Sequence, residues 1–172
     1  MAEGARRLSG RLAIDGGIPV RPVECRWPEW PTPAGDSSRM LASVLHSGRW
    51  AITSPGKGEL FERRFARMFA EYVGVRFCIP VDHGSSALVV ALESLGLDYG
   101  DTVLVPAITW VATATAVLRA GLVPVLADVD AQTGCLPPES VRRGAGARAV
   151  IPVHWACAMA DVPAISAALP AT

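Results

Sequence analysis

Apolar runs and helix-like segments alternate along the chain from residue 75 onward. The pattern predicts strands at 75–81, 102–106, 123–127 and 148–153, and helices at 85–95, 109–120, 138–143 and 159–169. The strand segments lack the polar–apolar alternation of a half-exposed sheet, and a helix separates each from the next. This order is typical of an α/β fold, in which helices cover both faces of a mostly parallel sheet.

Two further helices and an arm precede the sheet. Apolar positions recur at helical spacing between 36 and 48, and again from 59 to 72. Residues 1–35 are rich in Pro and Gly and have no helical period, so an extended arm is expected there. The predicted organisation is therefore an arm at 1–35 and a folded part at 36–172, with its sheet beginning near residue 75.

Composition and charge exclude several classes of protein. The 172-residue chain has a formal net charge of zero, which gives no electrostatic basis for binding nucleic acid or an anionic membrane. The four cysteines lie far apart without a CxxC pair, which argues against a zinc site and favours reduced thiols. The sequence shows neither a signal peptide nor a membrane span, and a cytoplasmic protein is expected.

The turn between segment 75–81 and the next helix is the first candidate for a binding site. Gly84, Ser85 and Ser86 stand where that helix begins. The first N–H groups of a helix lack partners within it and lie at the positive end of its dipole. Two hydroxyls beside them would complete a cradle for a phosphate. A plain capped helix is the alternative, because Ser is a good N-cap residue.

Polar and aromatic residues also follow the other predicted strands. Trp110, Asp128, Asp130 and His154 come after the strands at 102–106, 123–127 and 148–153. Ligands of parallel α/β sheets bind at the carboxyl ends of the strands, so these side chains are expected at the same edge as the phosphate turn. The sequence alone leaves Trp110 equally suited to the core and His154 equally suited to a structural hydrogen bond.

Seven short motifs occur in order along the chain. They lie at 12–17, 27–31, 47–52, 62–66, 84–88, 105–110 and 152–154. Together they resemble the N-terminal half of the DegT/DnrJ/EryC1/StrS aminotransferases. The Trp-rich arm and segment 49–52 are most similar to the glutamine:scyllo-inosose and 2-deoxy-scyllo-inosose aminotransferases of aminoglycoside antibiotic biosynthesis.

The resemblance implies the N-terminal part of a PLP-dependent transferase type I fold, acting as a homodimer with active sites at the subunit interface. Its cofactor is pyridoxal 5′-phosphate (PLP), and Gly84, Ser85 and Ser86 would bind the cofactor phosphate. Trp110 would stack on the pyridine ring, and His154 lies in a segment near the cofactor. The implied reaction transfers an amino group from an amino acid, here glutamine, to a keto-cyclitol or keto-sugar.

The loop around residues 50–58 is expected near the substrate. By resemblance it reaches toward the neighbouring subunit, which makes Trp50 and Lys57 candidate substrate-binding residues. Lys57 is the only lysine of the chain, and it precedes the sheet instead of following one of its strands. A plain loop charge, or a contact to the partner's site, is the alternative role for it.

Transamination needs a lysine that holds the cofactor as a Schiff base and an acidic partner for the pyridinium nitrogen. In the family both lie further along than Thr172, so the chain is expected to be truncated and not to transaminate by itself. An inactive remnant, or a half-domain that depends on a partner and still binds phosphate, is the alternative. A nucleotide-binding module is a distant third, because the chain lacks both GxGxxG and GK[ST].

Three residues depart from the family pattern. His83 stands where the family has a small polar residue, and Trp155 and Cys157 stand where it has Leu and a Gly-type turn. We expect Trp155 and Cys157 to change the local packing and to leave the phosphate cradle unaffected.

Overall fold

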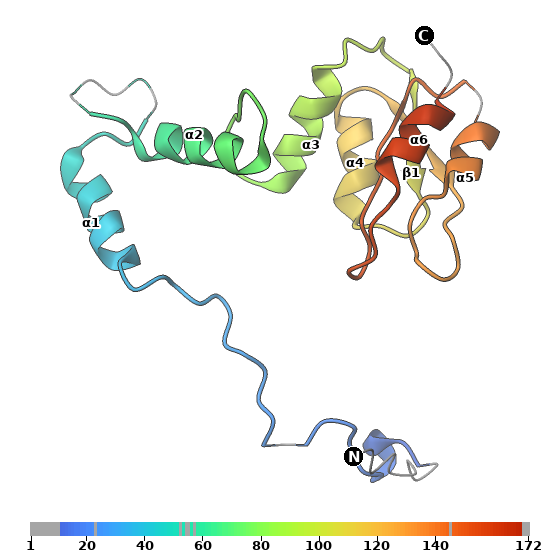
Figure 1. Cartoon of the computed structure of the whole chain (residues 1–172), viewed down its shortest axis with the longest axis horizontal. Helices are drawn as coiled ribbons and strands as arrows, with labels where there is room; N and C mark the ends of the chain where they lie inside the picture. The colour runs from blue at the N-terminus through green and yellow to red at the C-terminus, as the bar shows by residue number, and fades with distance from the viewer. Residues whose placement is uncertain are drawn as a thin grey trace. The chain divides into compact units, whose positions relative to one another are not determined.

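The computed structural model describes residues 11–22, 24–51, 53, 56, 58–144 and 146–169. The chain forms two compact units, Met1–Arg63 and Arg64–Thr172, and each is described by itself (Figure 1). The boundary predicted between residues 35 and 36 stays a prediction.

The first unit contains the arm and helix α1 (Ser37–Ser47). In its described residues the arm holds one 3-10 turn, η1 (Ala13–Asp15), and a further turn closed by the Cys25 N–H on the Pro22 carbonyl at 3.0 Å, and it leaves Trp27 and Trp30 exposed. The extended arm over 1–35 stays a prediction. Helix α1 ends where predicted, at Gly48, whose φ of +66° is a conformation that glycine adopts without steric cost.

Helix α2 (Phe61–Val73) forms where the apolar spacing predicts it. On its apolar side Phe65 stacks on Phe69, with ring centroids 5.6 Å apart. Only Ala70 is buried, whereas Phe65, Met68, Phe69 and Tyr72 each expose 45% or more of their surface. The helix is therefore amphipathic, but its apolar face is not covered by the described residues.

The second unit is an α/β domain. Its elements are α3 (Gly84–Glu93), β1 (Thr102–Pro106), α4 (Val111–Arg119), β2 (Val123–Ala127), α5 (Pro138–Arg143), β3 (Ala149–Val150) and α6 (Val162–Ala168). The three strands are parallel in the order β2-β1-β3, with Pro106 opposite Ala127 and Leu104 opposite Val150. The predicted parallel sheet is confirmed.

Helices cover both faces of β1. Val103 and Val105 point to one face and pack with Val117 of α4 and Leu92 of α3. Leu104 points to the other face, where it packs with residues of α5 and α6, among them Ile165. Successive side chains of a strand alternate between faces, so an unbroken apolar strand needs a layer on each side.

Segment 75–81 was predicted as a strand, and that prediction is wrong. It forms no regular structure, no described residue pairs with it, and Phe77 and Ile79 are 72% and 76% exposed. A strand exists through the hydrogen bonds of a neighbour, and both edges of β1 are occupied by β2 and β3. The apolar run shows that the segment is hydrophobic, but it does not show whether a neighbouring strand pairs with it.

The boundaries predicted for the last two elements also differ. Strand β3 was predicted over 148–153, but its pairing covers only Ala149–Val150 and ends with the Ile151 N–H, which donates to the Leu104 carbonyl at 2.9 Å. Helix α6 begins at Val162 instead of 159, since Asp161 caps it by accepting from the Ala164 N–H at 3.0 Å.

Within the part of the chain that the structure describes, no helix combines the length and the apolar character needed to span a membrane.

Candidate cofactor site

The carboxyl edge of the sheet collects most of the predicted site residues. Pro106 and Ala127 pair at the ends of β1 and β2, so the segments that follow them leave the sheet at one edge. Helix α4 starts there, with Trp110 as its N-cap residue. The other end of α3 leads into the amino end of β1, and α3 packs beside α4 (Figure 1), so the first turn of α3 also faces the carboxyl edge.

A histidine, and not a serine, caps α3. The His83 backbone is extended, and its imidazole Nδ1 accepts a hydrogen bond from the Ser86 N–H at 3.2 Å. The first regular helical bond follows, from the Ala87 N–H to the His83 carbonyl at 3.2 Å. The sequence did not predict this role for His83. An N-cap side chain accepts from the N–H two or three residues further on, which is where Ser86 lies.

Asp82 holds the other side of the same ring. Its Oδ2 lies 3.3 Å from His83 Nε2, and its Oδ1 accepts from the His83 N–H at 3.1 Å. The Ser86 hydroxyl, opposed by partial desolvation and aided by the His83 ring and backbone N–H, holds the pKa of Asp82 below its usual value. An ionised carboxylate therefore stands just before the start of α3 at neutral pH.

The remaining groups at this helix start fit a phosphate. A Cβ added to Gly84 would meet no atom within 4 Å, so the approach to the turn is open. Gly84 and Ser85 are in the first turn, where N–H groups have no acceptor inside the helix, and the side chains of Ser85 and Ser86 are half-buried. These donors, at the positive end of the dipole, suit a dianionic ligand.

Trp110 is not a core residue. Its side chain is 75% exposed and makes no capping hydrogen bond to α4. The loop before α4 is held instead by the hydroxyls of Thr109 and Thr113, 2.8 Å apart. The structure thus leaves the indole available at the carboxyl edge, and its stacking role stays a prediction.

Asp130 is engaged in its own turn after β2. Its Oδ1 accepts from the N–H groups of Gln132 and Thr133 and from the Thr133 hydroxyl, at 2.8–3.1 Å. The Thr133 N–H, followed by the Thr133 hydroxyl, lowers the pKa of Asp130 despite a small opposing effect of burial. This carboxylate stabilises a turn and is turned toward backbone donors.

His154 holds the loop that follows it. Its Nδ1 accepts a hydrogen bond from the Ala160 N–H at 3.0 Å, which fixes the ring relative to residues 155–160. The structural alternative left open by the sequence therefore has a contact to support it. That His154 lies beside the cofactor remains a prediction.

Residues 155–158 form a two-residue hairpin turn. Trp155 and Ala158 exchange two backbone hydrogen bonds, of 3.0 and 2.7 Å. Ala156 and Cys157, between them, have φ values of +44° and +70°. Positive φ at both central residues is the signature of a type I′ turn, which ordinarily uses Asn and Gly. At this place the chain therefore makes a turn that usually requires Gly, but with residues that carry side chains.

Replacing Cys157 by Gly is expected to raise the free energy of unfolding by about 1 kcal/mol, because a side chain at positive φ is strained. Cys157→Ser is the matched control, since it removes the thiol but keeps the Cβ and should give no gain. Both are measured by urea unfolding. A Cys157→Gly protein no more stable than the Ser variant would contradict the assignment of strain to the backbone.

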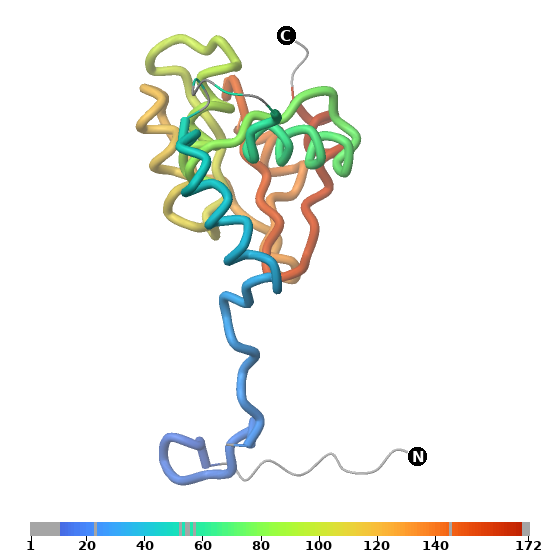
Figure 2. The backbone as a smooth tube through the Cα atoms, turned by 90° about the vertical axis from the view of Figure 1, so that its left-hand side faces the viewer, coloured from blue at the N-terminus to red at the C-terminus, as the bar shows by residue number. Residues whose placement is uncertain are grey.

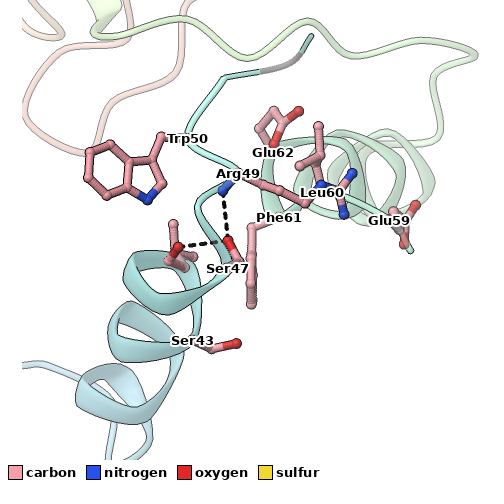
Figure 3. A pocket seen from close by; sticks show the side chains of 9 residues that line it. Ser43, Ser47, Arg49, Trp50, Glu59, Leu60, Phe61 and Glu62 are labelled. Atoms are coloured by element: carbon pink, nitrogen blue, oxygen red, sulfur yellow. Dashed lines mark hydrogen bonds between the residues drawn. The ribbon is translucent and has the colours of Figure 1, made fainter. Parts of the chain in front are cut away.

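Trp50 lies in the first unit, at the rim of a cavity of about 460 Å³ formed by the end of α1 and the start of α2 (Figure 3). Its indole N–H donates to the Leu45 carbonyl at 3.3 Å. Ser47 closes the end of α1, donating to the Val44 carbonyl and accepting from the Arg49 N–H. Lys57 lies outside the described residues. The substrate-binding roles of Trp50 and Lys57 stay predictions.

The chain has clear relatives. The model of the DegT/DnrJ/EryC1/StrS aminotransferase family matches residues 34–170. Over 159 residues the chain is 46% identical to an L-glutamine:2-deoxy-scyllo-inosose aminotransferase of Micromonospora echinospora, a match that covers 91% of this chain and 37% of that protein. The chain thus spans little more than a third of the length of such relatives.

Solved structures show the same fold. A 3-amino-5-hydroxybenzoic acid synthase aligns with a TM-score of 0.76 at 34% identity, covering 83% of this chain and 37% of that one. NtdA from Bacillus subtilis, with bound cofactor PMP, aligns with a TM-score of 0.66 at 28% identity, covering 74% and 28%. The predicted fold class is confirmed. Because the family model matches most of this chain, the chain belongs to the DegT/DnrJ/EryC1/StrS aminotransferase family.

Proposed function

We propose that this chain supplies the phosphate-binding part of a PLP-dependent aminotransferase that acts on a keto-cyclitol or keto-sugar, with glutamine as amino donor, in aminoglycoside-type biosynthesis. The observation that carries the proposal is the 46% identity to an L-glutamine:2-deoxy-scyllo-inosose aminotransferase over 159 residues. The chemistry of the α3 start supports it, because its donors suit a phosphate.

The residues would divide the work by position. The N–H groups of Gly84 and Ser85, with the hydroxyls of Ser85 and Ser86, would hold the phosphate at the helix start. The exposed indole of Trp110 would offer its face to the pyridine ring, and His154 would border the same edge. When bound, PLP supplies an electron sink for the carbon that gains or loses the amino group.

The described residues of this chain bind and orient; they do not include a lysine, and Lys57 is the only one in the sequence. We therefore propose that the 172-residue chain by itself binds the phosphate without transaminating. Trp50 and Lys57 would contact substrate. A non-enzymatic half-domain that retains phosphate binding is the second candidate, favoured by the single lysine.

Assembly and location complete the proposal. A homodimer is supported by the uncovered apolar face of α2, where Phe65 and Phe69 are exposed. A cytoplasmic location is supported by Cys25, Cys78, Cys135 and Cys157, which are all free thiols and so suit a reducing compartment.

Exchanging both cradle serines, Ser85→Ala with Ser86→Ala, is expected to weaken binding of pyridoxine 5′-phosphate by about 1–3 kcal/mol, because two hydrogen bonds to a charged group are lost. Pyridoxine 5′-phosphate lacks the aldehyde and so cannot react with lysine. Binding is measured by isothermal titration calorimetry.

The matched control is Ser94→Ala. Ser94 lies at the other end of α3, where its hydroxyl donates to the Ala91 carbonyl at 2.7 Å. This variant should bind as the parent does. If the double variant also binds as the parent does, the proposed cradle is wrong.

A further inference from the structure

A further backbone donor at the α3 start, beside those of Gly84 and Ser85, is already in use. In the first turn the Ser86 N–H points at the His83 imidazole, 3.2 Å from Nδ1. A ring nitrogen that accepts a hydrogen bond carries no proton, so the His83 proton is on Nε2. A phosphate oxygen is also an acceptor, and one N–H group cannot donate at full strength to both.

Asp82 keeps the ring in this accepting form. The Asp82 carboxylate lies 3.3 Å from Nε2, on the side of the ring opposite Nδ1. The negative charge of a carboxylate there favours a proton on Nε2, the tautomer that leaves Nδ1 free to accept, as carboxylates do for other positioned histidines. Ser86 Oγ lies 3.5 Å from the same Nε2, so the ring contacts the N–H and the hydroxyl of that serine.

The ring can leave this position at little cost in packing. The side chains of His83 and Asp82 are 55% and 71% exposed, so no core contact holds the imidazole in place. What holds it is the cap itself, together with the Asp82 contact. A cap of this kind stabilises a helix start only modestly, so a ligand with several charge-assisted bonds can replace it.

We propose that His83 is an internal cap that competes with the cofactor phosphate for the Ser86 N–H, so that phosphate binding at the α3 start displaces the imidazole. This inference rests on the proposed function, because the competing ligand is the phosphate of PLP. It makes His83 a positioning residue that sets the affinity of the site and keeps the helix start capped until the phosphate arrives.

The opposite role for His83 gives the opposite result. If the imidazole were a direct ligand of the phosphate, its removal would weaken phosphate binding. If the imidazole competes, its removal increases the affinity for phosphate, because the ligand no longer has to displace the cap. The expected increase is about fivefold for a typical cap. The sign of the change therefore decides between the two roles.

The experiment compares His83→Ala with His83→Asn in the full 172-residue chain. Ala removes the acceptor, and the extended backbone of His83 suits it (φ −161°, ψ 168°). Asn keeps a side-chain acceptor for the Ser86 N–H and so keeps the competition. With pyridoxine 5′-phosphate as probe, we expect the Ala variant to bind about fivefold more tightly and the Asn variant to bind nearly as the parent does. Inorganic phosphate should follow the same order, and pyridoxine, which has no phosphate, should not discriminate between the variants.

A spectroscopic readout tests the displacement directly. In the parent, addition of pyridoxine 5′-phosphate should shift the ¹⁵N resonance of His83 Nδ1 as it loses the Ser86 N–H, while the Ser86 amide stays protected from hydrogen exchange. In His83→Ala without ligand, the Ser86 amide should exchange faster and regain protection on binding. A histidine resonance that does not move on binding overturns the proposal.

The two proposals fail in different ways. Binding that is lost in the double serine variant but unchanged or weakened in His83→Ala retains the phosphate site and overturns the competing cap. Absence of binding to the parent and to every variant overturns both.

Discussion

Truncation of Leu104 to Ala is expected to lower the free energy of unfolding by about 2–5 kcal/mol, because a central core side chain is lost and a cavity remains. Leu104 is 2% exposed and stands in the middle strand of the sheet, in one cluster with Leu136 and Ile165. Both of its methyl groups lie 2.6 Å from the place where a Cβ on Gly144 would be, so backbone and leucine already meet closely. That tight fit leaves little room for the surroundings to collapse into the cavity.

The neighbouring strand provides the matched control. Leu126 of β2 is 68% exposed, so Leu126→Ala removes the same atoms from a place where they are already in water. It should change stability by no more than about 0.5 kcal/mol. Urea unfolding followed by circular dichroism measures both. Similar losses for the two leucines would contradict the burial of Leu104 against α5 and α6.

The second large effect is expected at Gly134. Its φ is +68°, and a Cβ added there would lie 2.6 Å from Cδ1 of the Trp155 indole. Gly134→Ala should therefore lower the free energy of unfolding by about 2–4 kcal/mol, through backbone strain and overpacking together. Figure 2 shows the two loops concerned side by side, and the Cys135 thiol also reaches the Ala158 carbonyl, at 3.6 Å.

Gly96 separates the two causes. Its φ of +64° is nearly that of Gly134, but a Cβ there would meet nothing within 4 Å. Gly96→Ala should therefore show the backbone strain alone, about 1–2 kcal/mol. The same Gly134→Ala change is then made in a Trp155→Ala background. There it should lower the free energy of unfolding only as much as Gly96→Ala does in the parent. If the excess persists, the indole is not its cause.

Local patterns were sufficient to predict most of the second unit. Strands β1 and β2 are found at the predicted residues. Each is an unbroken apolar run, and a helix that a glycine terminates precedes each of them. Helix α5 is also found at 138–143. These elements depend on nearest-neighbour properties, namely periodicity, caps and glycines at positive φ.

The misses concern features that depend on partners. Segment 75–81 has the composition of a strand, but pairing is a property of two segments and cannot be predicted from one. The cap by His83 depends on a side-chain rotamer that brings Nδ1 to Ser86, which composition does not specify. The turn at Ala156 and Cys157 has positive φ without glycine, because two reciprocal hydrogen bonds between Trp155 and Ala158 hold it. The sequence thus predicted that the site lies at the carboxyl edge of the sheet. It did not predict the hydrogen bonds that the site residues make there.

The position of β1 in the sheet has a consequence for the order in which the chain assembles. β1 is the first strand in sequence but the middle one in space, so both of its partners are synthesised after it. The pair with β2 needs only the intervening helix, whereas the pair with β3 closes a loop from Leu104 to Val150 and carries the larger entropic cost. During synthesis, therefore, one side of β1 stays without hydrogen-bond partners until about residue 151 has left the ribosome.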